Sequence, residues 1–550
     1  MNNQLRNELL QLSSSQLREL LHASGHSELL RDVKNEKHEV DEQLVTEAKN
    51  EGNAFFNCGC LHDAVSAYSR CIDMDPNNAV CLSNRAAAYL KLNEFELALA
   101  DCTKAIEIVP TIKPFMRRAM AHLALTHYEE AVADFAAALK FEPRNKECYA
   151  QLQTIVDSAT NAQQHDSMFS TKLRRAGIHA MMIVSVRDGW SVCAVRGNPG
   201  PAAVNGHTLF RGYNERIYLF GGRAVREQKP DVFVLDESDN SSWDIVPTRG
   251  VGAPLSCAWH STSVIGKKEK NNICVYGGVS SQGEDASVHL LVPTTSRDFE
   301  WVQAHCAQNL KEIPASRSGH AAVSIIDSND DQAVYIFGGR TKRGVSDQLL
   351  ILHLSSIQHE KDVSNPIHAT ITWEEVCPCD HIDTVGSRSF WPSARDGHSM
   401  CYFPSTGNQA PRLIVFGGNG QLNDDKKNDV WLYDLETQLW TFFDCFGDCP
   451  TPRSYHTAHA VGNFLLVVCG RTADSEDDGV YMLDIEGAEW HKLPIPSNSD
   501  FSPRAWHSSI LTEAGKLFVL GGGTFHGPLK SAAILDLGYF HAQAPLLSHH

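Results

Sequence analysis

The sequence predicts a multidomain α and β protein, in which an N-terminal α-helical repeat stack is followed by a six-bladed all-β propeller. Between residues 41 and 143 a helical unit recurs at intervals of 33 or 34 residues. From Trp190 onward the chain changes to short strands rich in β-branched and aromatic residues, punctuated by glycine pairs. The first tryptophan of this region precedes any complete strand unit, which predicts that the propeller is closed by its N-terminal strand.

Length, charge and cysteine content set the class of protein. A chain of 550 residues is too long for one hydrophobic core and is expected to form at least two domains. Its formal charge of −18 argues against a nucleic-acid partner, which requires a basic surface. Because we find no apolar run of signal-peptide or membrane-span length, we expect no membrane partner and a cytoplasmic location, with the nucleus as an alternative. The 16 cysteines are then expected to be reduced thiols, of which Cys71, Cys81, Cys102 and Cys274 act as small apolar residues.

The expected domain boundaries follow from these changes along the chain. Residues 1–40 are expected to form two short helices of unknown role, with Ser13 to Ser15 supplying an N-cap and Gly25 a stop. Three helical repeats and a capping helix are expected over 41–165, a linker over 166–185, the propeller over 186–540 and a tail over 541–550.

Each helical repeat consists of two amphipathic helices. The second helix carries a small alanine that lets the pair approach closely, and a proline then stops it. The alanines are Ala64, Ala98 and Ala131, and the prolines are Pro76, Pro110 and Pro143. Residues 148–162 have helical periodicity and are expected to cap the end of the stack. Three consecutive units of this kind resemble the tetratricopeptide-repeat family, which implies a concave groove lined by the first helices.

Five polar residues on these first helices are expected to face the groove. Lys49 and Asn53 lie four residues apart, hence on one face of a helix, and Lys113 and Arg117 repeat this spacing in the third unit. Asn84 lies in the second unit. Two lysines, an arginine and two amides that converge on one groove suit a ligand with two carboxylates.

This set resembles the dicarboxylate clamp of tetratricopeptide co-chaperones, which bind the Glu-Glu-Val-Asp tail of the seventy- and ninety-kilodalton heat-shock chaperones. The resemblance implies that Lys49, Asn53 and Asn84 hold the terminal main-chain carboxylate. It implies that Lys113 and Arg117 hold the aspartate side chain and nearby backbone. Single matches are common on exposed helix faces, whereas five positions in register favour a clamp. The sequence does not determine where the Lys113 side chain points, because a proline follows it and the repeat has one residue fewer in the segment just before it.

The second region repeats a unit of histidine, two strands ending at a glycine pair, a third strand and a tryptophan. The histidines are His207, His260, His320, His398, His456 and His507. The pairs end at Gly222, Gly278, Gly339, Gly418 and Gly522, and the fifth unit has Gly470 alone. Arginines precede four of the histidines, at Arg317, Arg395, Arg453 and Arg504. This unit resembles the kelch repeat, which implies four-stranded radial blades, glycines where blades approach closely, and tryptophans packed on their own or the neighbouring blade.

The spacing of tryptophans and histidines predicts six blades rather than five or seven. Trp190 precedes His207 by 17 residues, the same spacing that separates Trp243 from His260. The last unit, which starts at His507, ends without a tryptophan of its own. The strand at Trp190 is therefore expected to complete the sixth blade and to leave no open sheet edge.

Two basic turns that follow glycine pairs form a candidate ligand-binding rim on the propeller. The rim residues are Arg223, Arg226, Arg340, Lys342 and Arg343. A basic arc suits an acidic peptide, as in some kelch propellers, and a solvated rim without a ligand is an equally good interpretation. The protein ligand of the propeller stays unidentified at this point.

No catalytic, metal or cofactor site is expected. The thiol-rich segment 58–62 falls in the short turn between paired helices. Cys377, Cys379 and His381 lie in an insertion without a four-ligand zinc spacing, and whether they bind metal stays open. We find no glycine-rich phosphate loop, no nucleophile motif and no Glu-x3-Asp-x3-His iron site of the plant specifier type. The chain is therefore interpreted as a non-enzyme.

These features predict a protein–protein interaction adaptor of co-chaperone type. The helical repeats are expected to bind the acidic C-terminal tail of a heat-shock chaperone, while the propeller holds a client or second partner. The alternative is a substrate-recognition subunit of a ubiquitin ligase complex, since many kelch propellers have that role. The BTB, F-box and U-box segments that would support the alternative are not found in the sequence.

Overall fold

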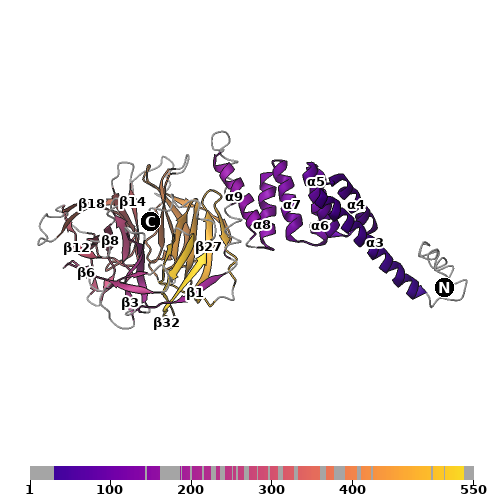
Figure 1. The fold of residues 1–550 in the computed structure, drawn as a ribbon. Helices are drawn as coiled ribbons and strands as arrows, with labels where there is room; N and C mark the ends of the chain where they lie inside the picture. The colour runs from indigo at the N-terminus through magenta and orange to yellow at the C-terminus, as the bar shows by residue number, and fades with distance from the viewer. Residues whose placement is uncertain are drawn as a thin grey trace. The chain divides into compact units, whose positions relative to one another are not determined.

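The chain, described by a computed structural model, divides into two compact units, residues 1–184 and 185–550 (Figure 1). The structure describes residues 30–142, 145–161 and 177 of the first unit, and residues 186 and 189–537 of the second with short gaps. The gaps lie at 198–200, 203, 213–215, 225–230, 236–241, 251, 255–257, 266–271, 281–282, 295–297, 308–313, 327–331, 359–366, 377–390, 406–409, 423–424, 497–499 and 513–514.

Successive helices form the first unit. They are α3 (Leu30–Cys58), α4 (Leu61–Met74), α5 (Ala79–Leu92), α6 (Phe95–Ile108), α7 (Ile112–Ala124), α8 (Tyr128–Leu139) and α9 (Lys146–Asn161). Helix α3 begins at Leu30 and continues past residue 40, so the boundary expected there lies inside one helix. The two short helices expected near the N-terminus fall within 1–29, outside the described residues. Helix α9 contacts α8, as expected of a capping helix.

Small residues bring the two helices of each repeat together, as the spacing predicts. Ala64, Ala98 and Ala131 are fully buried. The closest approach in the first repeat is at Gly52, where an added Cβ would lie 2.6 Å from the ring of Tyr68. A larger residue at position 52 would therefore displace the tyrosine.

Two ion pairs recur at the same place in the second and third repeats. Arg85 donates from Nε and Nη2 to the Asp101 carboxylate, both at 2.7 Å. Arg118 makes the same two bonds to Asp134 at 2.8 and 2.7 Å. In each case the arginine lies on the first helix of a repeat and the aspartate on the second, so the pair holds the two helices together.

Six blades form the second unit, each with four antiparallel strands, and three of them add a short fifth strand that pairs parallel with the outer strand. The innermost strands are β2 (Val204–Arg211), β7 (Ser261–Ile265), β14 (Ala321–Ile326), β20 (Ser399–Phe403), β25 (Thr457–Val461) and β29 (Ser508–Leu511). The second strands are β3 (Ile217–Ala224), β8 (Asn272–Tyr276), β15 (Gln332–Phe337), β21 (Arg412–Asn419), β26 (Phe464–Arg471) and β30 (Lys516–Leu520). The third strands are β4 (Val232–Leu235), β11 (Val288–Pro293), β18 (Leu349–Gln358), β22 (Lys426–Asp434), β27 (Glu476–Asp484) and β33 (Ser531–Asp536). The outer strands are β5 (Trp243–Val246), β12 (Phe299–Gln303), β19 (His368–Val376), β23 (Leu439–Phe443), β28 (Glu489–Lys492) and β1 (Trp190–Ala194).

Strand β1 completes the sixth blade, which confirms closure by the N-terminal strand. It pairs antiparallel with β33, with Trp190 opposite Leu535 and Ala194 opposite Ser531. The other side of β33 pairs with β30, so both edges of β33 are covered. The innermost strands contact one another in chain order, and β29 returns to contact β2.

Tryptophans of the outer strands pack against the preceding blade. Four of their rings lie 5.0 to 5.2 Å from the aromatic ring that precedes the glycine pair of that blade. The pairs are Phe220–Trp301, Tyr276–Trp373, Phe337–Trp440 and Phe416–Trp490. The sequence left own and neighbouring blade as alternatives; all four contact the neighbour, and Trp440 also lies 5.0 Å from Tyr433 of its own blade. Such offset aromatic contacts stabilise the interfaces between blades.

Buried arginines tie the start of a blade to its own glycine pair. In the four blades that have such an arginine its side chain is at most 1% exposed, and its Nη1 donates to a backbone carbonyl of the pair. The bonds are Arg317 to Gly338 (3.0 Å), Arg395 to Gly417 (3.0 Å), Arg453 to Cys469 (2.8 Å) and Arg504 to Gly521 (3.1 Å). Cys469 stands where the other pairs have their first glycine and adopts the same left-handed backbone, with φ of 57°.

The blade histidines link each blade to the one before it. Nε2 of four of them bonds to the hydroxyl of the residue that follows the previous histidine. The pairs are His260–Thr208, His320–Ser261, His456–Ser399 and His507–Thr457, at 2.8 to 3.0 Å. Two blades depart from the pattern. At the position that corresponds for His398 the chain has Ala321, which has no hydroxyl, and Nε2 of His398 has no hydrogen-bond partner among the described residues. Ser508, the residue at the corresponding position for His207, accepts a hydrogen bond from the Leu209 amide instead.

Candidate functional site

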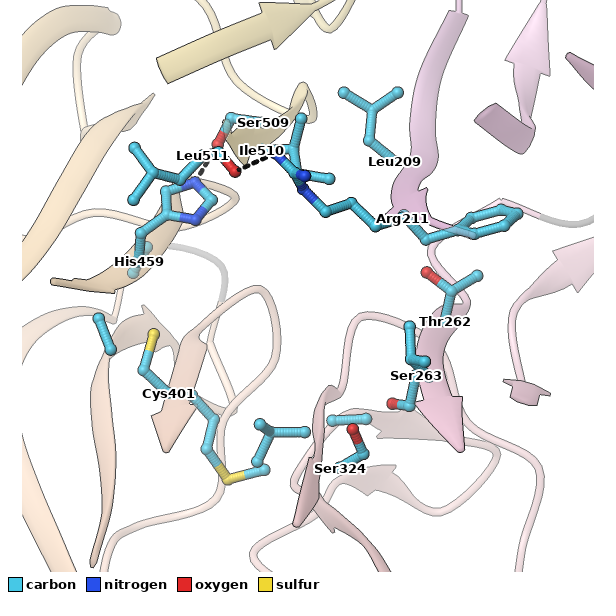
Figure 2. Close-up of a pocket in the computed structure, with 17 residues that line it drawn as sticks. Leu209, Arg211, Thr262, Ser263, Ser324, Cys401, His459, Ser509, Ile510 and Leu511 are labelled. Atoms are coloured by element: carbon cyan, nitrogen blue, oxygen red, sulfur yellow. Dashed lines mark hydrogen bonds between the residues drawn. The ribbon is translucent and has the colours of Figure 1, made fainter. Parts of the chain in front are cut away.

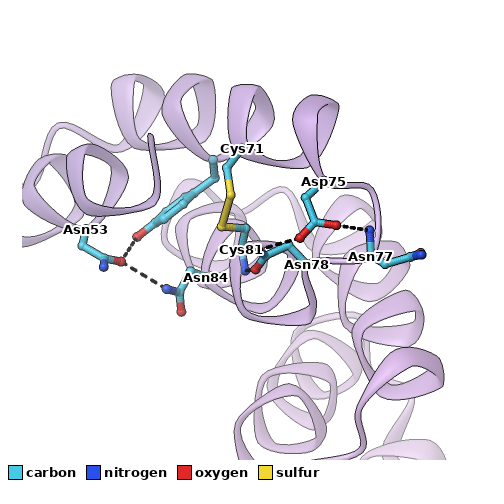
Figure 3. The surroundings of a disulfide bond; sticks show 8 residues. Asn53, Cys71, Asp75, Asn77, Asn78, Cys81 and Asn84 are labelled. Atoms are coloured by element: carbon cyan, nitrogen blue, oxygen red, sulfur yellow. Dashed lines mark hydrogen bonds between the residues drawn. A yellow bond between two sulfur atoms is a disulfide. The ribbon is translucent and has the colours of Figure 1, made fainter. Parts of the chain in front are cut away.

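The candidate groove residues lie on α3, α5 and α7, the first helices of the three repeats. Oδ1 of Asn53 accepts hydrogen bonds from the Tyr68 hydroxyl at 2.8 Å and from Asn84 Nδ2 at 3.1 Å. Figure 3 shows the two amides pointing toward one another. Because the Asn53 oxygen accepts both bonds, the N–H groups of the Asn53 amide are directed toward other acceptors. Among the described residues these N–H groups have no acceptor. An oriented pair of N–H donors suits an anionic ligand.

Arg117 extends this network from the third repeat. Its Nη1 donates to the backbone oxygen of Ser83 at 2.6 Å, to Ser83 Oγ at 2.7 Å and to Asn84 Oδ1 at 3.2 Å. Burial lowers the pKa of Arg117, and a guanidinium nevertheless stays charged because its ordinary pKa is so high. Arg85 and Arg118 are paired with aspartates, whereas Arg117 has no carboxylate partner in the described part of the chain. Its positive charge is therefore available to a ligand.

The two lysines flank the network at its ends. Lys49 is half-buried and lies one turn before Asn53 on α3, and Lys113 is exposed one turn before Arg117 on α7. Within the described residues neither ammonium group has an ion-pair partner. Lys113 stands in the first turn of α7, with Pro114 buried next to it. The structure thus joins Asn53, Asn84 and Arg117 directly and sets each lysine on the same helix face as one of them.

A disulfide between Cys71 and Cys81 lies beside the network (Figure 3). Cys71 follows Tyr68 by three residues on α4, and Cys81 precedes Asn84 by three residues on α5. The bond therefore links the helix turns that hold both donors to Asn53. The expectation that all cysteines are reduced thiols is wrong for these two. A separation of 10 residues across a loop gives no sequence signal for the pairing, which depends on how the two helices meet.

The candidate rim of the propeller is partly neutralised. Arg340 Nε donates to Asp396 Oδ2 at 2.7 Å, and Asp396 is 2% exposed, so this arginine is held by a buried carboxylate. The remaining described members are exposed; they are Arg223, Lys342 and Arg343. Arg226 lies outside the described residues. Lys342 and Arg343 sit at the tip of the hairpin formed by β16 (Arg340–Thr341) and β17 (Gly344–Val345).

A closed ring of backbone hydrogen bonds runs through all six blades, and the sequence reasoning missed it. Each blade contributes the residue before its histidine, whose N–H donates to the carbonyl of the preceding member at 2.6 to 3.0 Å. The members are Gly206, Trp259, Gly319, Gly397, Tyr455 and Trp506. All six have φ between 53° and 66°. Three of them are glycine and three are aromatic, so no single residue type in the sequence indicates the left-handed backbone that all six positions share.

A cavity of about 240 Å³ is enclosed by the six innermost strands (Figure 2). Its described lining is mostly apolar, with the cation of Arg211 at one side and hydroxyl groups around it. Arg211 donates to the backbone oxygen of Leu511 at 3.1 Å, and His459 Nε2 lies 2.7 Å from Ser509 Oγ. Arg211, His459 and Ser509 thus hold neighbouring blades together, whereas the buried Ser263 hydroxyl has no hydrogen-bond partner among the described residues.

The described residues form neither a metal-ligand cluster nor a membrane-spanning helix. No group of three or more His, Cys, Asp or Glu side chains there is placed to hold a metal ion. Cys377, Cys379 and His381 lie outside the described residues. None of the helices in the described ranges combines the length and the apolar character that a membrane span requires.

Both repeat regions match models of known protein families. The model of the KLHDC2/KLHL20/DRC7 Kelch-repeats domain matches residues 206–374 and 377–540. The tetratricopeptide repeat model matches residues 79–112, which span α5 and α6. Repeats of these two families are interaction modules, typically without catalysis, and they make the chain a protein–protein interaction adaptor.

Individual relatives are similar to part of the chain. Kelch domain-containing protein 2 of Bos taurus is 25% identical over 299 residues, which cover 50% of this chain and 65% of the relative. Host cell factor 2 of Homo sapiens is 23% identical over 367 residues, covering 63% and 43%. Kelch domain-containing protein 1 of Homo sapiens is 26% identical over 276 residues, covering 46% and 60%. The chain spans less than two thirds of the length of each of these relatives. Because the kelch model matches more than half of its residues, the chain belongs to the KLHDC2/KLHL20/DRC7 Kelch-repeats domain family.

Proposed function

We propose that the helical groove binds the free C-terminal carboxylate of an acidic peptide, of the Glu-Glu-Val-Asp kind that ends heat-shock chaperones, while the propeller holds a second protein. The observation that supports this most is the hydrogen-bonded array of Asn53, Asn84 and Arg117. In this array the side-chain oxygens of Asn53 and Asn84 already accept hydrogen bonds from protein donors, so it is N–H groups that remain for a ligand. Such a surface has few free acceptor atoms for a cation and several donors for a carboxylate.

The charges around the array support the same ligand. Arg117, Lys49 and Lys113 come from α7 and α3 and carry no carboxylate partner among the described residues. In the proposal Lys49, Asn53 and Asn84 hold the main-chain carboxylate of the last residue. Lys113 and Arg117 hold the side-chain carboxylate and nearby backbone. Five side chains from three helices then donate hydrogen bonds to the two carboxylates of a terminal aspartate.

Peptide binding to the full chain tests this assignment. A peptide ending in Glu-Glu-Val-Asp with a free carboxylate is expected to bind with a Kd of about one micromolar, about −8 kcal/mol. Amidation of its C-terminus should remove most of this affinity, because the oriented donors lose the charge that they hold. Isothermal titration calorimetry measures both. Equal affinity for the free and the amidated peptide would contradict a carboxylate clamp.

Two clamp variants and one control locate the site. Lys49→Ala and Arg117→Ala are each expected to weaken binding by about 1.5–3 kcal/mol, the range for hydrogen bonds to charged groups. Lys104→Ala is the matched control, because Lys104 is an exposed lysine on α6, a second helix, and its loss changes the net charge equally. A loss of affinity in the control as large as in Lys49→Ala would indicate non-specific attraction instead.

A role in substrate recognition for a ubiquitin ligase is the second candidate, and membership in a kelch-repeat family favours it. Affinity capture with the full chain separates the two candidates. Heat-shock chaperones that are lost with Arg117→Ala support the first, and cullin scaffolds that persist with Arg117→Ala support the second. A chaperone partner implies a cytoplasmic or nuclear location, which imaging of the tagged chain would test.

A further inference from the structure

The turn between α3 and α4 carries two thiols that the proposed adaptor function does not use. Cys58 is the last residue of α3, Cys60 immediately precedes α4, and Gly59 joins them. Both cysteines are exposed. Among the other described free cysteines only Cys449 is exposed, and the rest are buried or half-buried. The pair is therefore the most accessible concentration of thiols in the described part of the chain.

The backbone of this turn brings the two thiols together. Gly59 has φ of +83°, a left-handed conformation that glycine adopts readily, and a Cβ built there meets no atom within 4 Å. The Cys60 amide donates to the Phe55 carbonyl at 2.9 Å, and the Cys58 thiol donates to the same oxygen at 3.2 Å. The site is thus open to solvent, and Gly59 turns the chain between the two cysteines.

The same contacts make the two thiols chemically different. Hydrogen bonding to the amide and the thiol of Cys60 lowers the pKa of Cys58, whereas hydrogen bonding to Cys58, followed by electrostatic repulsion from it, raises the pKa of Cys60. Cys60 is the N-cap of α4 and makes no side-chain capping bond, so the positive end of that helix also faces the pair. Cys58 therefore loses its proton more readily than Cys60, which assigns Cys58 as the attacking thiol and Cys60 as the thiol that completes the exchange.

We propose that Cys58 and Cys60 form a reactive dithiol that exchanges with small-molecule disulfides of the glutathione class. The Cys58 thiolate attacks one sulfur of glutathione disulfide, which forms a mixed disulfide and releases one glutathione thiolate. Cys60 then loses its proton to solvent and attacks the Cys58 sulfur. This step forms the Cys58–Cys60 disulfide and releases the second glutathione. The two cysteines lose two electrons and two protons in total, and the glutathione disulfide gains them.

A metal site at the same turn is less well supported. Two thiolates satisfy half of the four ligands that a structural zinc ion takes. Around this pair the described residues supply no third His, Cys, Asp or Glu ligand in a suitable position. Exchange with a disulfide needs only the two sulfurs and access for the oxidant, and both are present.

Oxidation of the full chain by glutathione disulfide, followed by peptide mapping with mass spectrometry, tests the proposal. The expected product at neutral pH is a peptide with residues 58 and 60 joined and two hydrogens lighter than its reduced form. Cys449 is the internal control for an exposed thiol without a partner, and it should react about tenfold more slowly. Residues 58 and 60 staying reduced while Cys449 is modified would overturn the proposal.

Two serine variants test the order of attack. Cys60→Ser should trap glutathione on Cys58 as a stable mixed disulfide, because the second thiol is missing. Cys58→Ser should slow modification of Cys60 by about tenfold, because glutathione can then no longer reach Cys60 through a mixed disulfide on Cys58. Equal rates at position 60 with and without Cys58 would refute the assigned roles. The helical circular dichroism signal of both variants should match the parent, since both positions are exposed in a turn.

Discussion

The helical stack and the propeller are both built from repeats, yet they handle their ends and their buried polar groups differently. The stack is linear: each helix pair contacts its neighbours, and the groove stays open along the first helices. The propeller is a ring, since β29 contacts β2 and β1 pairs with β33. In the stack, the arginines of the Arg–Asp pairs stay about one fifth exposed. In the propeller, the corresponding fixed arginines are at most 1% exposed.

This difference shows what each architecture is suited to do. An open stack can leave charges such as Arg117 without an internal partner and offer them to a ligand. A closed ring buries its arginines within blades and its histidines between blades, where four of the six histidines bond to the preceding blade. The ring therefore depends strongly on every blade, whereas the stack depends mainly on nearest neighbours. All 10 tryptophans lie in the propeller unit, so tryptophan fluorescence reports on the ring and helical circular dichroism on the stack.

Removal of the closing strand is expected to have the largest effect. Deleting residues 1–195 takes away β1, exposes an edge of β33 and uncovers apolar surface, so aggregation and loss of cooperative unfolding should follow. Deleting 1–165 leaves β1 in place and should leave a folded propeller. Light scattering and fluorescence-monitored melting compare the two. Identical behaviour of the two truncations would contradict closure by β1.

Mild acid is expected to destabilise the ring more than the stack. Burial lowers the pKa of five blade histidines, with neighbouring arginines adding to the effect for some of them. The pKa falls to about 4 for His207, to about 3 for His320 and His456, and well below the ordinary value for His398 and His507. The unfolded chain takes up protons below about pH 6.5 and the ring does not, so the stability present above that pH is lost as the pH falls.

The size of this loss can be set from the linkage relation. Each such histidine is expected to remove about 2 kcal/mol from the free energy of unfolding near pH 5. The stack has His122, half-buried, with its pKa lowered by burial, and therefore a smaller response. Urea unfolding followed by fluorescence and by circular dichroism at about pH 7 and pH 5 measures both units. A fluorescence midpoint unchanged between these conditions would contradict the burial of neutral histidines.

Matched arginine substitutions compare the two units directly. Arg453→Ala removes a fully buried guanidinium and leaves Asp477 and the Cys469 carbonyl without it, at an expected cost of about 3–5 kcal/mol. Arg118→Ala breaks the partly exposed pair with Asp134 and should cost about 1–2 kcal/mol. Denaturant titrations with the two signals measure each. Equal losses would mean that an ion pair in the closed ring contributes no more to the free energy of unfolding than an ion pair in the open stack.

The smallest expected effect is a repair of the histidine pattern. Ala321→Ser supplies the hydroxyl that His398 lacks and should raise the free energy of unfolding of the propeller by about 0.5–1.5 kcal/mol. Ser399→Ala removes the hydroxyl bonded to His456 and should lower it by about 1–3 kcal/mol. A destabilising Ala321→Ser would indicate that the pocket beside His398 has no room for the hydroxyl.

The repeat units themselves could be derived from the sequence. Alanine and proline phases identified the helix pairs, and the tryptophan and histidine spacing gave six blades with the Trp190 strand as the last, because these patterns are local and periodic. The same periodicity assigned Lys49 and Asn53 to one face of α3. What each helix or strand presents to its neighbour was therefore readable from spacing alone.

Contacts between repeats were decided by the tertiary structure. The Asn53–Asn84–Arg117 array, the Cys71–Cys81 bond and the Arg340–Asp396 pair each join residues whose approach depends on the angle between elements. The same holds for the packing of tryptophans on the preceding blade and for the backbone ring before the histidines. Spacing along the chain specifies a period and a face. Which partner that face meets, and in which rotamer, is specified only when the repeats are packed together, since that packing fixes distances that no single repeat contains.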